Sequence, residues 1–180
     1  MVSWCRMGSK KKKEASRHIL VLEPYYGGSH KAFLRGLQHH LGHLDCRFTL
    51  LTLPARKWKM RMQLAAPYFA EQIVNLAQQG QRFDVLLTSS FLDVAVLRSL
   101  LVLGGTNIGL QHLLHLPIAV YFHENQFDYP NQIQDSSIFQ FSSINFTSAL
   151  CADRVAFNSQ YNLETFLSGV RSYVKKATDM

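Results

Sequence analysis

Two segments of the sequence combine residue types that bind sugars, phosphates or metal ions. Residues 23–31 read EPYYGGSHK and contain two tyrosines, two glycines, a serine and a histidine. Residues 123–130 read HENQFDYP and place a histidine beside two acidic residues, two amides and two aromatic rings. A histidine next to carboxylates can orient a hydroxyl group, move a proton or stabilise a developing positive charge. Both segments are therefore candidates for binding or catalysis, although a solvated polar loop would also account for the second.

The glycine pair of the first segment has two explanations. Gly27 and Gly28 allow a ligand to approach the backbone closely, and the N-terminus of a following helix favours an anionic or polar group. A tight turn that needs glycine would account for the same pair. The neighbouring Tyr25, Ser29 and His30 favour the ligand. The GxGxxG pattern of dinucleotide-binding loops is absent.

Histidine spacing elsewhere does not predict a metal site. His39 and His43 lie four residues apart and His112 and His115 three apart, but we interpret both pairs as ordinary surface histidines. The second segment is not an HExxH motif, because its fifth residue is Phe127.

A basic stretch, residues 54–63, is expected to be an irregular loop. Four cations surround a tryptophan there, so the loop either binds phosphates and stacks a nucleic-acid base or is an ordinary solvated surface. These residues are Arg56, Lys57, Trp58, Lys59 and Arg61.

Composition sets limits on the remaining possibilities. The 180 residues are 47% apolar and 17% charged, enough for a substantial core. Of the formal net charge of +7, most lies in residues 1–17, which hold six basic side chains and one acidic one. The body is nearly neutral, which argues against a strongly basic nucleic-acid-binding domain. Three widely separated cysteines, no signal peptide and no uninterrupted apolar span predict a cytoplasmic protein, with the nucleus as an alternative, and no membrane partner.

Short apolar runs alternate with helical periodicity along the chain. Strands are expected at residues 19–22, 48–53, 85–88, 117–122 and 155–157. Helices are expected after a cap at Ser29, at residues 64–77 with a stop at Gly80, and at residues 91–103, 138–150 and 160–170. This order predicts an α/β, Rossmann-like parallel sheet with helices on both faces. Ligands of such folds bind at the carboxyl ends of the strands, where both polar segments lie.

Four segments in this order resemble the N-terminal half of the tRNA-queuosine α-mannosyltransferase family, over about residues 18–172. They are residues 22–31, 89–93, 121–130 and 157–162. The family consists of glycosyltransferase-like proteins of the GT-B type, grouped with the family-4 retaining transferases. The resemblance therefore implies the N-terminal half of a GT-B fold.

The resemblance also implies an activity and roles for residues. Mannose would be transferred from GDP-mannose to queuosine in tRNA, with the nucleotide sugar as co-substrate and no further cofactor. The implied catalytic residues are His123 and Glu124, and no metal is expected. The loop implied to approach the donor comprises Gly27, Gly28, Ser29 and His30, and the substrate-binding residues comprise Tyr25, Asp93, Asn125, Gln126 and Asn158.

The expected domain organisation follows from the same comparison. Residues 1–17 form a disordered basic arm, residues 18–172 the acceptor-side domain, and residues 173–180 a tail. The donor-binding half of a GT-B protein is absent from this sequence, so a separate C-terminal half is an expected partner beside tRNA and the nucleotide sugar. The alternative is a non-catalytic Rossmann-like module that binds a nucleotide or RNA.

Overall fold

A parallel β-sheet with helices on both faces forms the body of the protein. The computed structural model describes residues 16–105, 109–127 and 138–178. Its elements are β1 (Arg17–Tyr26), α1 (Gly28–Leu41), the short 3-10 helix η1 (Gly42–Leu44), β2 (Cys46–Pro54), α2 (Trp58–Gln78), β3 (Val85–Ser89), α3 (Val94–Gly105), the 3-10 helix η2 (Gln111–His115), β4 (Ile118–Phe122), α4 (Ile138–Cys151), β5 (Arg154–Phe157) and α5 (Gln160–Thr178).

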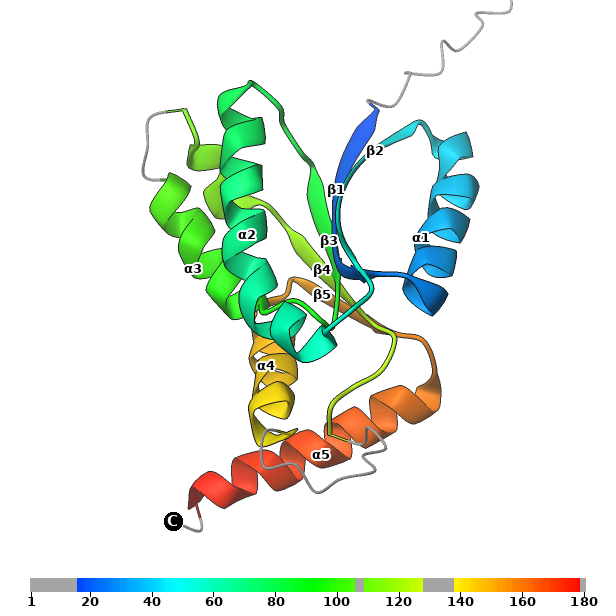
Figure 1. Cartoon of the computed structure of the whole chain (residues 1–180), viewed down its shortest axis with the longest axis vertical. Helices are drawn as coiled ribbons and strands as arrows, with labels where there is room; N and C mark the ends of the chain where they lie inside the picture. Colours follow the sequence, from blue (N-terminus) through cyan, green and yellow to red (C-terminus); the bar gives the residue numbers. More distant parts are fainter. Residues whose placement is uncertain (1–15, 106–108, 128–137, 179–180) are drawn as a thin grey trace, which may run out of the picture.

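The strand order, β2-β1-β3-β4-β5, confirms the expected Rossmann-like α/β fold. All four strand pairs are parallel. The chain first moves from β1 outward to β2 and then returns to add β3 on the other side of β1. Because of this reversal, α1 lies on one side of the sheet and α2 and α3 lie on the other (Figure 1). The gap between the ends of β1 and β3 is the usual ligand position in such sheets.

The central strand β1 is buried on both faces, as its continuous apolar run predicts. Leu20 and Leu22 join the core that α2 and α3 cover, whereas Ile19 and Val21 join the smaller core beneath α1. The small core does not extend across the whole sheet. An apolar groove of about 320 Å³ lies between α1 and the exposed face of β4 and β5.

The expected start of the second helix is wrong, whereas its expected end is confirmed. The basic stretch at residues 54–63 is not an irregular loop, because α2 begins at Trp58. The Trp58 ring packs against Phe91 and Phe141, and Met62 is fully buried, so tertiary packing gives these residues a helical conformation. This packing accounts for Trp58 without a stacked base. The stop at Gly80 is confirmed: it follows α2 with a φ of +84°, a conformation that favours glycine.

The termini of the domain also differ from expectation. β1 begins at Arg17, which the sequence assigned to the arm, and α5 continues to Thr178 instead of ending at residue 170. Tyr173 explains the extension, because its ring contacts Phe127, Phe139 and Phe146. The expected arm at residues 1–15 and the end of the second polar segment, residues 128–130, lie outside the described residues.

Adjacent positions in α3 allow a test of the core. Leu97 is fully buried against the sheet, whereas Val96 is 40% exposed. We expect Leu97→Ala to lower the free energy of unfolding by about 2–5 kcal/mol, because it leaves a cavity. Val96→Ala is the matched control and should change it by no more than about 0.5 kcal/mol. Urea unfolding followed by circular dichroism measures both, and equal losses would contradict this packing of α3.

Candidate functional site

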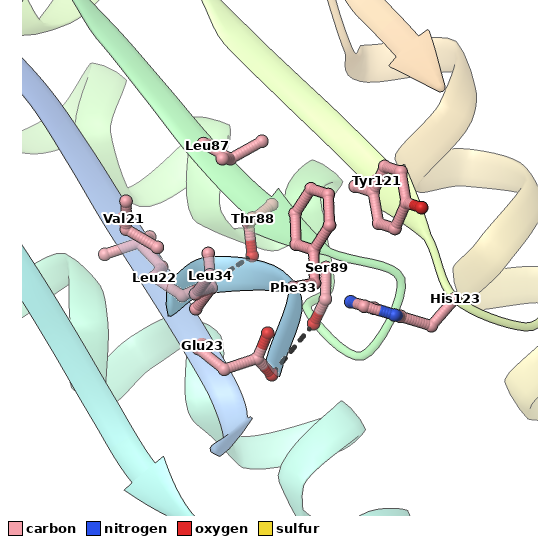
Figure 2. Close-up of a pocket in the computed structure, with 10 residues that line it drawn as sticks. All are labelled: Val21, Leu22, Glu23, Phe33, Leu34, Leu87, Thr88, Ser89, Tyr121 and His123. Atoms are coloured by element: carbon pink, nitrogen blue, oxygen red, sulfur yellow. Dashed lines mark hydrogen bonds between the residues drawn. The ribbon is translucent and has the colours of Figure 1, made fainter. Parts of the chain in front are cut away.

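The polar residues of the carboxyl edge converge between β1 and β3. Glu23 comes from β1, Ser89 from the end of β3 and His123 from the residue after β4, and these side chains point toward one another (Figure 2). His30, in the first turn of α1, completes the group. We call Glu23, His30, His123 and Glu124 the edge cluster. It lies at the point where the strand order reverses, the place that the fold class favours for a ligand.

Glu23 is the most deeply buried residue of the edge cluster. Its side chain is 2% exposed, and Oε1 accepts hydrogen bonds from Tyr25 N at 2.8 Å and from Ser89 Oγ at 3.0 Å. The same oxygen lies 3.1 Å from His30 Nδ1. A buried carboxylate needs such partners to offset the loss of hydration. Glu23 lies in the first candidate segment of the sequence, but no individual role was predicted for it. The available signal was an acidic residue that follows a buried apolar run within the same strand.

His30 lies between two carboxylates. While Nδ1 faces Glu23, Nε2 lies 3.7 Å from Oε1 of Glu124, whose side chain is 27% exposed. Burial by itself lowers the pKa of His30, but Glu124 and Glu23 outweigh that effect and raise the pKa to about 9. At neutral pH His30 is therefore an imidazolium held by two acidic side chains.

His123 stacks on His30 and has the opposite protonation behaviour. The ring centroids are 4.0 Å apart and the planes differ by 25°. Burial and the positive charge of His30 lower the pKa of His123 to about 4, against the smaller opposing effects of Glu23 and Glu124. His123 is therefore neutral at pH 7. A neutral imidazole can accept a hydrogen bond at one nitrogen and donate one from the other.

The amides after His123 hold the loop in place. Asn125 is buried, and its Nδ2 donates to Oδ1 of Asn162 at 2.8 Å and to Oγ1 of Thr165 at 2.9 Å, both on α5. The backbone of the buried Gln126 is held on both sides, because its N–H donates to Asn145 and its carbonyl accepts from Ser142. The structure thus gives both residues a structural position. Their expected contact with substrate stays a prediction.

Asn158 lies between β5 and α5 and holds the backbone of His123 in place. Its Nδ2 donates to the His123 carbonyl oxygen at 2.6 Å, and its Oδ1 accepts from Nδ2 of Asn162. Because the residue is also exposed, it lies at the surface of the site.

Tyr25 belongs to the same neighbourhood, whereas Asp93 has a local role. The Tyr25 ring is half-buried and packs edge-on against His30 and Phe91, at centroid distances of 5.9 and 5.4 Å. Asp93 Oδ1 accepts a hydrogen bond from Val96 N and so caps the start of α3.

The glycine loop differs from expectation at the helix cap. Ser29 does not cap α1; Gly27 is the N-cap residue, and no side chain caps this helix by a hydrogen bond. A Cβ atom on Gly27 would lie 2.4 Å from Cβ of Ala55, so close packing against the end of β2 requires glycine there. Gly28 has a φ of +49°, and apart from its chain neighbours and the backbone of its own helix no atom of the described residues lies within 4 Å of its missing Cβ. Gly28 and Ser29 are both exposed, so this part of the loop can meet a ligand.

The edge cluster does not favour a metal ion, although one carboxylate and two imidazoles offer ligand atoms within 4.8 Å of one another. A metal lies close to the plane of each imidazole that binds it. The two rings are stacked face to face, so one ion cannot lie in both planes without rearrangement. The ion pair between His30 and Glu23 also occupies the same atoms.

A cavity of about 10 Å³ lies behind the edge cluster, bordered by Glu23, Ser89, Tyr121 and His123 (Figure 2). This volume is close to the minimum for one water molecule. A sugar cannot enter it, so a substrate must approach from the exposed side, where Glu124 and the glycine loop lie.

These observations define a Rossmann-like α/β domain with a polar, partly buried site at the carboxyl edge of its sheet. A family model described as tRNA-queuosine alpha-mannosyltransferase N-terminal matches residues 18–180. The chain belongs to this family.

A curated relative and a solved structure can be compared with the chain. It is 37% identical over 166 residues to a Drosophila melanogaster protein described as tRNA-queuosine alpha-mannosyltransferase, a match that covers 92% of this chain and 40% of that protein. The chain therefore spans about two fifths of the length of this relative. It is also similar to a UDP-glucosyltransferase from Polygonum tinctorium, solved with 3,4-dichloroaniline, with a TM-score of 0.42 and 10% identity over 86% of this chain and 48% of the other.

No helix among the described residues has the length and the apolar composition needed to cross a membrane.

The two histidines give the protein a predictable dependence of stability on pH. The pKa of His30 rises from 6.5 to about 9 on folding, so its contribution is full below pH 6.5 and is lost as the pH rises through 9. The pKa of His123 falls from 6.5 to about 4, so the unfolded chain binds a proton that the folded chain does not, and stability is lost as the pH falls from 6.5 to 4. We expect His123→Gln to flatten the acid side of the stability profile. His30→Gln should flatten the alkaline side and also part of the acid side, because the positive charge of His30 helps to lower the pKa of His123. Urea unfolding between pH 4 and 9 measures this, with the exposed His39→Gln as control.

The close contact of the glycine loop predicts a rescue. Gly27→Ala should lower the free energy of unfolding by about 1–3 kcal/mol, because the new methyl group collides with Ala55. Ala55→Gly in the same chain should restore most of that loss. Gly28→Ala should cost about 1–2 kcal/mol through its left-handed backbone and should not respond to Ala55→Gly. Thermal unfolding of the single and double variants tests this, and a loss at Gly27 that Ala55→Gly leaves unchanged would contradict the described contact.

Proposed function

We propose that this chain is the acceptor-side domain of a GT-B-type glycosyltransferase that transfers mannose from GDP-mannose to queuosine in tRNA. The observation that carries the proposal is the family match over residues 18–180, together with the relative at 37% identity. The chain spans 40% of that relative, and a donor-binding half is proposed to complete the site. The cytoplasm is the proposed compartment.

The edge cluster supports a role in sugar transfer. A glycosyl group that leaves its diphosphate develops positive charge in the transition state. Two carboxylates around one imidazolium leave one net negative charge near His123, which suits such a centre. Glu124 and the neutral His123 are proposed to face the reacting sugar, with His123 bonded to one of its hydroxyl groups. The exposed loop of Gly28 and Ser29 is proposed to approach the donor.

The tRNA backbone is proposed to contact cations near the start of α2. Arg56, Lys57 and Lys59 are exposed around the start of α2, and this end of the helix lies at the carboxyl edge of the sheet (Figure 1). Such contacts position RNA without reading its sequence, so recognition of queuosine would fall to the residues of the site.

The single experiment that tests the proposal is a comparison of tRNA with and without queuosine. The purified chain is titrated with each tRNA in a filter-binding assay, and transfer is followed with radiolabelled GDP-mannose. We expect tighter binding to the queuosine-containing tRNA and no transfer by the chain alone, because leaving-group charge would be stabilised by the other half. Equal affinity for the two tRNAs would refute queuosine recognition by this domain.

A variant at the site sharpens the test. When the chain is combined with the remaining part of a longer relative, His123→Ala should lower kcat by roughly 10²-fold, the effect of one positioned polar group. The control is His39→Ala, an exposed histidine in the last turn of α1. Unchanged kcat in the His123 variant would remove this residue from the reaction.

The second candidate is a non-catalytic RNA- or nucleotide-binding module. It is favoured by the small size of the cavity behind the edge cluster, which leaves no room for a sugar. Queuosine-dependent binding without transfer in the combined system would support it.

A further inference from the structure

We propose that Glu23 is a positioning residue for His123: it holds His30 as a cation, and this cation keeps the stacked His123 ring uncharged and in place for a substrate hydroxyl group. The inference deepens the proposed function and rests on it for the identity of the substrate.

The first step is the free-energy cost of burying the Glu23 carboxylate. A carboxylate with 2% exposure at the end of the central strand is unfavourable unless its oxygens are compensated. One of its oxygens, Oε1, lies within 3.1 Å of three polar atoms, on Tyr25, Ser89 and His30. Two of these partners are neutral donors that fix the oxygen. His30 is the third partner and can supply the balancing charge.

The second step is the effect of Glu23 and the other neighbours on the charge and the orientation of the His30 ring. The charged and titratable groups around its ring are Glu23 from β1, Glu124 and His123 from the segment after β4, and Tyr25 at the ring edge. Phe91 packs on the ring as well, at a centroid distance of 5.1 Å. With one carboxylate near each nitrogen and an apolar neighbour, the imidazolium is fixed in orientation as well as in charge.

The third step is the effect on His123. Its ring is stacked on His30 at 4.0 Å, and Phe33 and Tyr121 contact it edge-on at 5.3 and 4.8 Å. A second positive charge at this distance from the first is unfavourable, so the ring stays neutral. The aromatic neighbours and the bond from Asn158 to its carbonyl oxygen restrict its movement.

A neutral His123 fits the chemistry that is proposed for the site. An imidazolium beside the reacting sugar would oppose the positive charge that develops there, whereas a neutral ring can bond to a hydroxyl without adding charge. Glu23 itself does not reach the substrate in this arrangement, because its side chain is buried and its Oε1 is already in contact with His30. It acts only through the two histidines.

The test follows the imidazole nitrogens of the ¹⁵N-labelled chain by NMR between pH 3.5 and 10. In the unchanged chain we expect His30 to stay protonated and His123 to stay neutral at pH 7. Glu23→Gln keeps the size of the side chain and removes its charge, so the pKa of His30 should fall. Ser89→Ala removes one hydrogen bond to the same oxygen but no charge, and it is the matched control that should leave the titration of His30 nearly unchanged.

A second variant tests the coupling between the rings. His30→Gln removes the positive neighbour, so the pKa of His123 should rise toward its ordinary value. A neutral His30 at pH 7 in the unchanged chain, an unchanged His30 titration in Glu23→Gln, or an unchanged His123 titration in His30→Gln would each overturn the proposal. If Glu23→Gln does not fold, as its amide spectrum would show, the proposal is tested by the protonation state of His30 in the unchanged chain and by the His123 titration in His30→Gln.

These titrations contain neither tRNA nor nucleotide sugar, so they separate the two proposals. Equal binding of tRNA with and without queuosine would refute the proposed function. The role of Glu23 would then still apply, with a different hydroxyl-bearing substrate. A neutral His30 at pH 7, or an unchanged titration in either variant, would refute the role of Glu23 and would not affect the proposed function.

Discussion

The buried carboxylate of Glu23 is the constraint on which the carboxyl edge of the sheet depends. An unpaired charge at this depth would destabilise the protein by several kcal/mol, so the surrounding elements must supply donors. The bonds to Tyr25 and Ser89 link the end of β1 to its own loop and to β3, and the contact with His30 adds the first turn of α1. The stacked His123 then brings in the end of β4. One acidic side chain thus organises three strand ends and a helix.

Much of the fold could be predicted because the strands of a parallel sheet have a strong local signal. The apolar run of β1 and the positive-φ glycine after α2 are properties of the local chain, and both were identified correctly. The start of α2 could not be identified in this way. The cations before and within its first turns obscure the apolar pattern of the sequence. The helix forms there because Met62 is buried and the Trp58 ring packs against Phe91 and Phe141, far along the chain.

The candidate site was predictable in position but not in the roles of its members. Sequence shows that polar residues follow the strands, and a parallel sheet brings those ends together. It does not show which amides face a ligand and which hold the loop. Asn125 makes its bonds to α5, and Asp93 caps α3, so side chains of similar type near the site have different structural uses. Glu23 was inside a candidate segment, but its role could not be predicted because it depends on burial and on partners 7 and 66 residues away.

The close approach of Gly27 to Ala55 also constrains how this family can change over time. There is room for only one Cβ atom between the two positions, so either residue can carry a methyl group only while the other is glycine. A lineage that acquires a side chain at position 27 must first pass through glycine at position 55. The reverse order goes through a destabilised intermediate. The path by which the loop diversifies is therefore directional, even though neither residue belongs to the edge cluster.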